Sequence, residues 1–267
     1  MPITLLTGPA NAGKAGVVLD ALRAHHARGE EPLLVVPTHA DVEHYRRELA
    51  HDGLVFGARV ERFQGLLAEV LRRAGHSERP LGRHARERVL AAVLEHRRRG
   101  GSRAEGALPA GGAAKADTMA APATPGVVGA LAGLVGELEV ARVAPARLRQ
   151  ALEAWAEADP AHGPRAQALA DLFEEYRGAL QRLGRVDPER RAARALDTLR
   201  RTPALWGATP VLLYGFDDFQ ELQLDAIETL GLLVGAPVTV SLAYEPGRVA
   251  FAGRGDTFQR LLPLAAE

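Results

Sequence analysis

The sequence predicts an α/β fold in which a parallel sheet is interrupted by a helical insertion. An apolar strand at residues 3–6 runs into a glycine-rich loop, short apolar runs then alternate with helical patterns, and the strand pattern disappears between residues 75 and 202. Alternating strands and helices indicate parallel strands joined by crossover helices. We expect a discontinuous sheet domain at 1–72 and 205–267, and a helical insertion at 73–204.

Composition sets broad limits on function. The 267 residues include 33 basic and 33 acidic side chains, so net charge gives no general argument for a nucleic-acid partner. The absence of cysteine excludes disulfides and thiolate metal sites. The start lacks the basic and apolar regions of a secretory signal, and the longest uncharged run, residues 118–136, is broken by prolines and glycines. We therefore expect a cytoplasmic protein that does not cross a membrane.

The loop after the first strand carries the clearest motif. Gly8, Gly13 and Lys14 have the spacing of a P-loop, in which backbone N–H groups converge on phosphate and the lysine reaches the terminal phosphates. The next residue is normally Ser or Thr, whose hydroxyl binds magnesium, but here it is Ala15. We expect ATP with Mg²⁺ as the ligand class, with hydrolysis disfavoured; a glycine-rich turn without a ligand is the alternative. The predicted phosphate-binding residues are Gly8, Asn11, Ala12, Gly13, Lys14 and Ala15.

The elements that follow the loop alternate in type. Residues 17–22 have helical spacing, and residues 32–36 form a continuous apolar run that is typical of a buried parallel strand. A polar helix is expected at 41–51. Residues 54–60 suggest a further strand region, and residues 62–71 lead into another helix.

The insertion reads as helical. Helical periodicity is found at residues 81–99, 127–140, 145–156, 165–183 and 188–199. Asp187 and Pro188 have the pattern of an N-cap followed by proline at the first helical position. Residues 100–126 contain almost no large apolar side chain, so we expect a flexible loop there. Residues 72–103 hold ten arginines against three glutamates, which could track a phosphate backbone or form a solvated helix face.

Strand patterns return near the end of the chain. Residues 210–216 predict a buried strand that ends in Asp217 and Asp218, followed by a helix at 221–233 and a strand at 238–242. An acidic residue at the end of a neighbouring strand usually holds the magnesium ion of a P-loop site. Asp favours helix N-termini as well, so the two residues could instead cap the helix that begins near Glu221. Both interpretations remain open.

Four stretches form a recognisable set, namely residues 8–14, 33–38, 59–67 and 213–223. Together they resemble the N-terminal region of the AddB/RexB-type subunits of bacterial ATP-dependent helicase–nucleases. The last stretch is the most specific, because Gly-Phe-Asp-x-Phe-x-x-x-Gln after a buried strand is typical of these subunits. In the third, Arg62 stands where the family's helicase motif has Ser.

The resemblance implies a degenerate superfamily 1 helicase fold, which is RecA-like and related to UvrD and RecB. It implies binding to single-stranded DNA or duplex ends, a catalytic helicase–nuclease partner subunit, and a role in the repair of double-strand breaks. The residues at the motif positions that meet DNA are Thr38, His39, Arg62 and Phe63.

Family members also carry a second motor domain and a nuclease domain with a cysteine-bound iron–sulfur cluster. This chain has no cysteine to hold such a cluster and extends over about one RecA-like domain. We therefore expect a DNA-binding scaffold that by itself neither unwinds nor cuts DNA. A stand-alone P-loop ATPase or phosphotransferase is the alternative.

Overall fold

The computed structural model describes residues 3–51, 53, 57–76, 79–104 and 123–265. Internal contacts divide the chain into a sheet unit, Met1–Ser77 with Ala192–Glu267, and a helical unit, Glu78–Arg191. The sheet unit is longer than the sheet domain that we expected at 1–72 and 205–267. The difference arises because the second half of helix α8 (Pro188–Arg201) packs into the core beneath the sheet.

The sheet unit is built on five parallel strands in the order β1-β7-β6-β2-β3. Their bounds are β1 (Ile3–Gly8), β2 (Leu33–Val36), β3 (Arg59–Arg62), β6 (Val211–Leu213) and β7 (Val238–Ala243). All four strand pairings are parallel, and helices connect the strands. The predicted α/β class is therefore confirmed.

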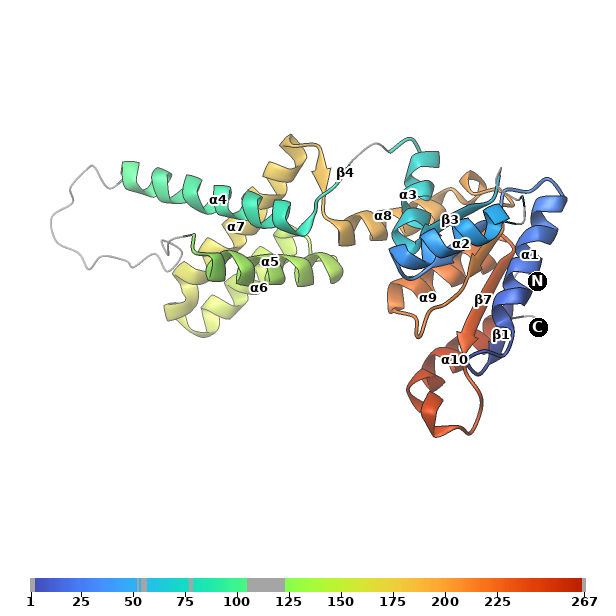
Figure 1. The fold of residues 1–267 in the computed structure, drawn as a ribbon. Coiled ribbons are helices and arrows are strands. Elements are labelled where there is room, and N and C mark those ends of the chain that lie inside the picture. Colours follow the sequence, from blue (N-terminus) through green and yellow to red (C-terminus); the bar gives the residue numbers. More distant parts are fainter. Residues whose placement is uncertain (1–2, 52, 54–56, 77–78, 105–122, 266–267) are drawn as a thin grey trace. The chain divides into compact units, whose positions relative to one another are not determined.

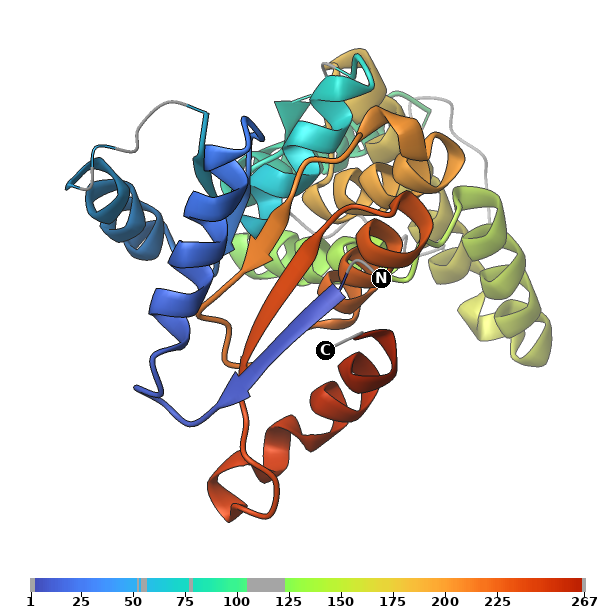
Figure 2. The same ribbon diagram turned by 90° about the vertical axis from the view of Figure 1, so that its right-hand side faces the viewer.

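Helices cover both faces of this sheet (Figure 2). In β2, Leu34 and Val36 belong to the core on one face, and Leu33 and Val35 belong to the core on the other. The first face is covered by α1 (Lys14–Ala27) and α2 (His39–His51). The opposite face is covered by α3 (Phe63–Arg73), the end of α8, α9 (Glu221–Glu228) and α10 (Gly255–Leu261).

The carboxyl ends of the five strands share one edge, because the strands are parallel. The register places Gly8 beside Ala243 and Val36 beside Arg62. The segments that follow β1, β2, β3, β6 and β7 therefore begin along this edge. Open α/β sheets bind ligands at this edge, and the residues of the predicted sites belong to the segments that begin there.

The helix after β6 differs from the prediction. Helix α9 ends at Glu228 and continues as a π-helical stretch, η3 (Thr229–Val234). A Cβ added at Gly231 would lie 2.3 Å from Ile3 Cγ1, so glycine allows this stretch to approach β1 closely. After β7 come η4 (Val249–Arg254), α10 and η5 (Leu262–Leu264), which we did not predict because none is long enough to show a period.

The helical unit contains four long helices among its described residues (Figure 1). They are α4 (Arg83–Ala104), α5 (Pro125–Val140), α6 (Pro145–Ala158) and α7 (Gly163–Arg182), with a short η1 (Pro160–His162). A small parallel pairing of β4 (Arg79–Pro80) with β5 (Arg185–Val186) was missed, since two residues carry no alternation. In the sheet unit a further short helix, η2 (Pro203–Leu205), follows α8.

The predicted loop at 100–126 was wrong at both ends, because α4 continues to Ala104 and α5 begins at Pro125. Residues 105–122, and the strand region suggested at 54–56, lie outside the described residues.

A buried polar network lies inside the helical unit. The Tyr176 hydroxyl donates to Asp187 Oδ1 at 2.7 Å, and Arg86 Nε donates to the same oxygen at 3.0 Å. Arg86 also binds Glu189. Burial raises the pKa of the Asp187 carboxyl, which is 1% exposed. The network fixes the start of α8 against α4 and α7. Within the described residues, no helix has both the length and the apolar character needed to span a membrane.

Candidate functional site

The loop between β1 and α1 has a backbone shape that few residues can adopt. Gly8, Asn11 and Gly13 have φ values of 151°, 62° and 78°. Glycine reaches positive φ without strain, and asparagine tolerates it better than most residues. A Cβ added at Gly8 would also lie only 3.3 Å from Ala12 Cβ. Gly13 is the N-cap of α1, and it has no side chain that could accept a hydrogen bond from the first N–H groups of this helix.

Lys14 is the first residue of α1 and folds back over this loop. Its Nζ donates to the carbonyl oxygens of Gly8 at 2.7 Å and Pro9 at 2.5 Å. Burial lowers the pKa of this ammonium. An ammonium has three N–H donors, so one remains beyond these two bonds. The positive end of the α1 macrodipole lies at the same place. The ammonium charge and the partial positive charge of the helix terminus together favour an anion at this loop.

Ala15 follows Lys14 in the first turn of α1 and is half-buried. Its methyl group cannot bind a metal ion. The motif therefore keeps its backbone and its lysine and lacks the hydroxyl ligand.

Asp217 and Asp218 do not cap helix α9, so that interpretation was wrong. The cap is Gln220, which exchanges hydrogen bonds with Gln223 in a capping box. Asp218 Oδ1 instead accepts from the Phe219 backbone N–H at 2.8 Å and from the Thr257 hydroxyl of α10.

Asp217 is paired with Arg254 at the end of η4. Arg254 Nη2 donates to Asp217 Oδ1 at 3.0 Å, and Arg254 Nη1 donates to the carbonyl of Ala243 at 3.0 Å. Ala243 is the register partner of Gly8, so Arg254 joins the end of β7, beside the glycine-rich loop, to the segment after β6. Asp217 remains 93% exposed.

A third contact joins the segment after β6 to the segment after β7. Arg260 of α10 pairs with Glu221, and this partner lowers the pKa of the Glu221 carboxyl. The acidic motif at 217–221 therefore anchors the C-terminal helical segment through Arg254, Thr257 and Arg260. These three residues are three positions apart, but the spacing does not identify their partners, so sequence reasoning did not find them. Among the described residues, no group of three or more His, Cys, Asp or Glu side chains is placed to hold a metal ion.

Thr38 and His39 lie directly after β2. Thr38 forms a capping box with Asp41: its hydroxyl donates to Asp41 Oδ2 at 2.6 Å and accepts from the Asp41 N–H at 3.1 Å. The Thr38 side chain is thus used by the fold, although the residue is exposed. His39 is the first residue of α2 and is exposed.

Arg62 and Phe63 have opposite environments. Arg62 is the last residue of β3 and is exposed, next to the end of β2. Phe63 is only 7% exposed and belongs to the core beneath the sheet. A buried ring is not available to a base, so the expectation that Phe63 meets DNA is corrected: it is a core residue.

The structure therefore places the predicted residues in two groups along one edge. The glycine-rich loop follows β1, which is an edge strand of the sheet. The group of Thr38, His39 and Arg62 lies at the ends of β2 and β3. Strands β7 and β6 lie between β1 and β2, which corresponds to roughly 14 Å at the usual strand spacing.

Most described arginines of the run at 72–103 are paired with acidic side chains. Arg72 and Arg73 bind Glu69 at 2.7 Å and 2.8 Å, and Arg59 lies 3.1 Å from the same carboxylate. The Arg72 guanidinium, followed by Arg73 and Arg59, holds the pKa of Glu69 well below its usual range. Arg73 also lies over the Trp206 ring at 4.4 Å. Further arginines of the run are paired in the helical unit, namely Arg86, Arg97, Arg98 and Arg99. Six of the ten arginines of the run therefore have an acidic partner among the described residues.

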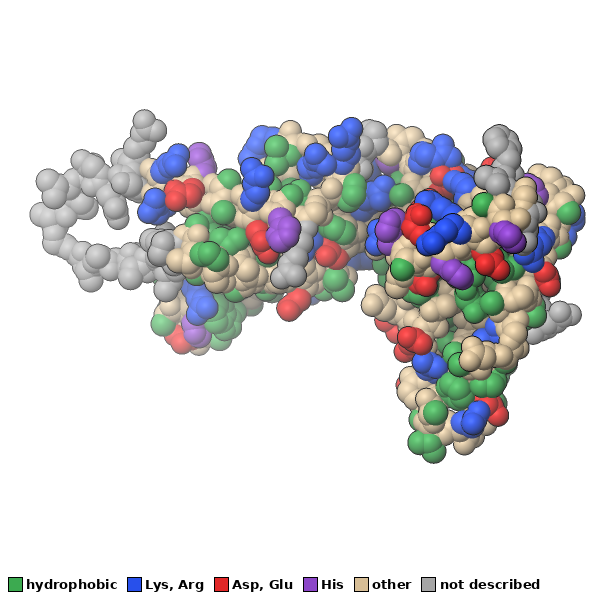
Figure 3. Space-filling view, viewed as in Figure 1, with side chains coloured by type: hydrophobic (Ala, Val, Ile, Leu, Met, Phe, Trp, Pro, Cys, Tyr) green, Lys and Arg blue, Asp and Glu red, His purple; other side chains and the backbone are tan. Residues whose placement is uncertain are grey.

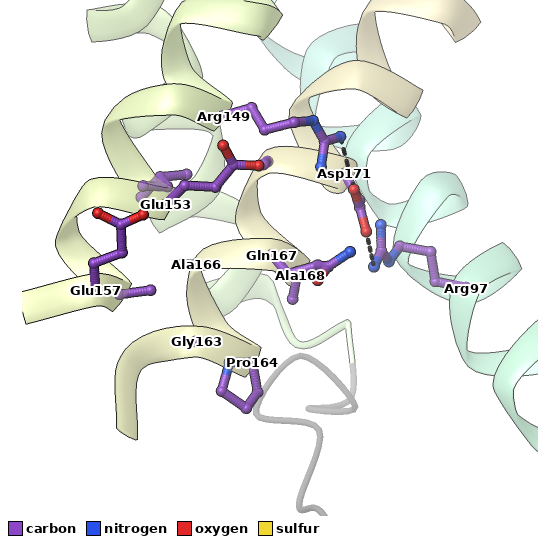
Figure 4. Close-up of a pocket in the computed structure, with 13 residues that line it drawn as sticks. Arg97, Arg149, Glu153, Glu157, Gly163, Pro164, Ala166, Gln167, Ala168 and Asp171 are labelled. Carbon is purple, nitrogen blue, oxygen red and sulfur yellow. Dashed lines mark hydrogen bonds and ion pairs between the residues drawn. The ribbon is translucent and has the colours of Figure 1, made fainter. Parts of the chain in front are cut away.

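A cavity of about 790 Å³ lies among α4, α6 and α7 in the helical unit (Figure 4). Asp171 accepts from Arg149 at 2.8 Å, and Arg97 approaches it from the other side at 3.9 Å. Glu153 and Glu157 lie on the α6 wall. None of the predicted site residues lines this cavity.

Comparison of the sequence with known proteins found no matching family model and no matching curated protein.

Proposed function

We propose that this chain is a P-loop domain of RecA-like type that binds the phosphates of a nucleotide and lacks the residues needed to split them. The observation that carries the proposal is the position of Lys14. Its ammonium lies at the N-terminus of α1, directly over a loop shaped by Gly8 and Gly13. Backbone N–H groups, a helix N-terminus and a lysine are the elements that cradle phosphates in such loops.

The absence of magnesium ligands supports a phosphate site without hydrolytic activity. Ala15 provides no hydroxyl for magnesium, and the two candidate carboxylates have partners within the chain. Asp217 is held by Arg254, and Asp218 is held by Thr257 and its own backbone turn. An arrangement of this kind favours binding of a nucleotide without turnover.

The wider role that we propose is that of a DNA-binding and scaffolding domain in a helicase–nuclease that repairs double-strand breaks. This part rests on the resemblance of the four sequence stretches to the AddB/RexB-type subunits and on two exposed side chains. His39 and Arg62 lie at the carboxyl ends of adjacent strands, where a strand of DNA could pass along the sheet edge. The catalytic activities would then belong to a partner subunit.

The first experiment measures nucleotide binding with a fluorescent ATP analogue. Lys14→Ala is expected to weaken binding about 10-fold or more, which corresponds to about 1.4 kcal/mol. The matched control is Arg47→Ala, which removes one positive charge from the exposed face of α2. Absence of binding by the unmodified chain, or equal binding by the Lys14→Ala variant, would contradict the phosphate site. Turnover that is abolished by Lys14→Ala would favour the stand-alone ATPase instead.

The second experiment measures binding to a single-stranded oligonucleotide at about 50 mM and about 200 mM salt, since phosphate contacts are weakened by salt. Arg62→Ala is expected to weaken binding several-fold, and Arg47→Ala again serves as the control. Binding that is absent at low salt, or indifferent to salt, would contradict the DNA-binding part of the proposal. It would not affect the proposed nucleotide site.

A further inference from the structure

An open groove of about 1050 Å³ runs between α4 and α7 in the helical unit. The residues that line it recur every three or four positions on each helix, so each helix presents one continuous stripe to the groove. On α4 the stripe consists of Ala85, Val89, Ala92 and His96, and on α7 it consists of Glu175, Ala179 and Leu183, which directly follows the helix.

The floor of the groove is aliphatic. Leu81 and Val93 belong to the core of the helical unit and also line the groove. Leu183 adds a large apolar side chain that is 58% exposed. The groove is therefore an apolar surface that the helical unit does not cover with any described residue.

The rim of the groove is positively charged. Arg88, Arg182 and Arg185 line it and are exposed, and none of them forms an ion pair with an acidic residue in the part of the chain that the structure describes. The one carboxylate in the lining, Glu175, is held by Arg97 at 3.0 Å. Figure 3 shows basic side chains gathered over the region of α4 and the end of α7. A binding partner with acidic side chains would therefore complement the charge of the rim.

We propose that this groove binds an amphipathic helix of a partner protein, with its apolar face on the floor and acidic residues against the three arginines. Two neighbouring helices with mostly apolar stripes form a groove into which a third helix can pack. A nucleic-acid strand fits less well, because the lining contains no Phe, Tyr or Trp ring to stack on bases, His96 is its one aromatic side chain, and the floor is aliphatic.

The test uses a synthetic peptide of about 18 residues, roughly five helical turns. It carries leucines at three- and four-residue spacing, glutamates on both flanks and a fluorescent label. A scrambled peptide of identical composition is the control probe. Anisotropy with the full chain is expected to show binding of the patterned peptide in the range of about 10–100 μM and at least 10-fold weaker binding of the scrambled one.

Two variants locate the binding. The double variant Arg182→Glu and Arg185→Glu is expected to weaken binding at least 10-fold, as is Ala92→Trp, which fills the floor at an exposed position. The matched control is Arg165→Glu, an exposed arginine of α7 outside the groove, and it should leave binding unchanged.

Equal binding of the patterned and scrambled peptides would overturn the proposal, because charge alone would then explain it. Binding of an oligothymidine that is lost in the double variant, with no binding of the patterned peptide, would overturn it too and would make the groove a nucleic-acid surface. The proposal does not rest on the phosphate loop, and Lys14→Ala should leave peptide binding unchanged.

Discussion

Arg254 and Asp217 form a bridge between the end of β7 and the segment after β6. One guanidinium nitrogen donates to the Asp217 carboxylate at 3.0 Å and another donates to the Ala243 carbonyl at 3.0 Å. In an active P-loop enzyme, a carboxylate near this position would serve the magnesium ion. Here it joins two loops of the scaffold. This use of the acidic residues supports the proposal that the loop binds phosphate without hydrolysing it.

The first prediction concerns magnesium. Nucleotide affinity is expected to differ less than about threefold between buffers that contain Mg²⁺ and buffers that contain a chelator, since Ala15 has no hydroxyl and Arg254 competes with a metal ion for the Asp217 carboxylate. The variant Ala15→Ser restores one hydroxyl and should make binding measurably stronger in Mg²⁺. Titration of the fluorescent ATP analogue under both conditions checks this. A strong magnesium requirement in the unmodified chain would show that a carboxylate is released from its partner on binding.

The second prediction concerns Glu69, which accepts from three arginines while 7% exposed. Glu69→Gln should lower the free energy of unfolding of the sheet unit by about 3 kcal/mol at neutral pH, because the partly buried guanidinium groups of Arg59 and Arg73 lose their partner. The folded-state pKa of Glu69 lies below its ordinary value of 4.5. The stability that it contributes is therefore fully present well above pH 4.5 and is lost as the pH falls through and below that value.

Urea unfolding followed by Trp206 fluorescence in a Trp155→Phe background measures this effect, because Trp206 lies against Arg73. The exposed Glu43, which pairs with Arg46 at 3.5 Å, provides the control. Glu43→Gln should change stability by less than about 0.5 kcal/mol. A difference between Glu69→Gln and the unmodified chain that grows on acidification would contradict the sign of the prediction.

The third prediction concerns Arg86, whose side chain is 11% exposed and binds Asp187 and Glu189. Arg86→Met should destabilise the helical unit by about 3 kcal/mol or more, since it leaves a buried carboxylate uncompensated. Tyr176→Phe removes one hydrogen bond to Asp187 and should cost only about 1–2 kcal/mol.

The pH dependence of the Arg86 variant follows from Asp187. Burial raises the folded-state pKa of this carboxyl, so the folded state holds its proton longer than the unfolded state and stability falls as the pH rises. Loss of Arg86 should steepen this fall. Trp155 fluorescence in a Trp206→Phe background reports unfolding of the helical unit, and equal slopes for variant and parent would argue against the assignment.

The fourth prediction concerns Gly231. A Cβ at this position would lie 2.3 Å from two carbons of Ile3, so Gly231→Ala should destabilise the sheet unit by about 2–3 kcal/mol through overpacking. Gly133 in α5 has no atom within 4 Å of an added Cβ. Gly133→Ala should therefore be neutral or stabilising by up to about 1 kcal/mol. Thermal unfolding of both variants tests the contrast, and equal effects would show that backbone propensity rather than packing dominates at Gly231.

The sequence by itself determined the parallel α/β class, because short apolar runs such as Leu33–Val36 and long helical periods are local patterns. It also located the loop from Gly8 to Lys14, whose glycine spacing reflects backbone conformations that few other residues adopt. The extent of helix α4 and the pairing of β4 with β5 were not predicted, since the first lacks an apolar period at its end and the second is two residues long.

Only the tertiary structure decided what the site residues do. A ring such as that of Phe63 looks the same in sequence whether it faces solvent or the core, and packing under the sheet buried it. The roles of Asp217 and Asp218 depended on Arg254 and Thr257, far along the chain, and long-range pairings of this kind leave no local periodicity to detect. Local conformation can therefore be predicted from the sequence of this protein, whereas the partner of each side chain is determined only by the tertiary structure.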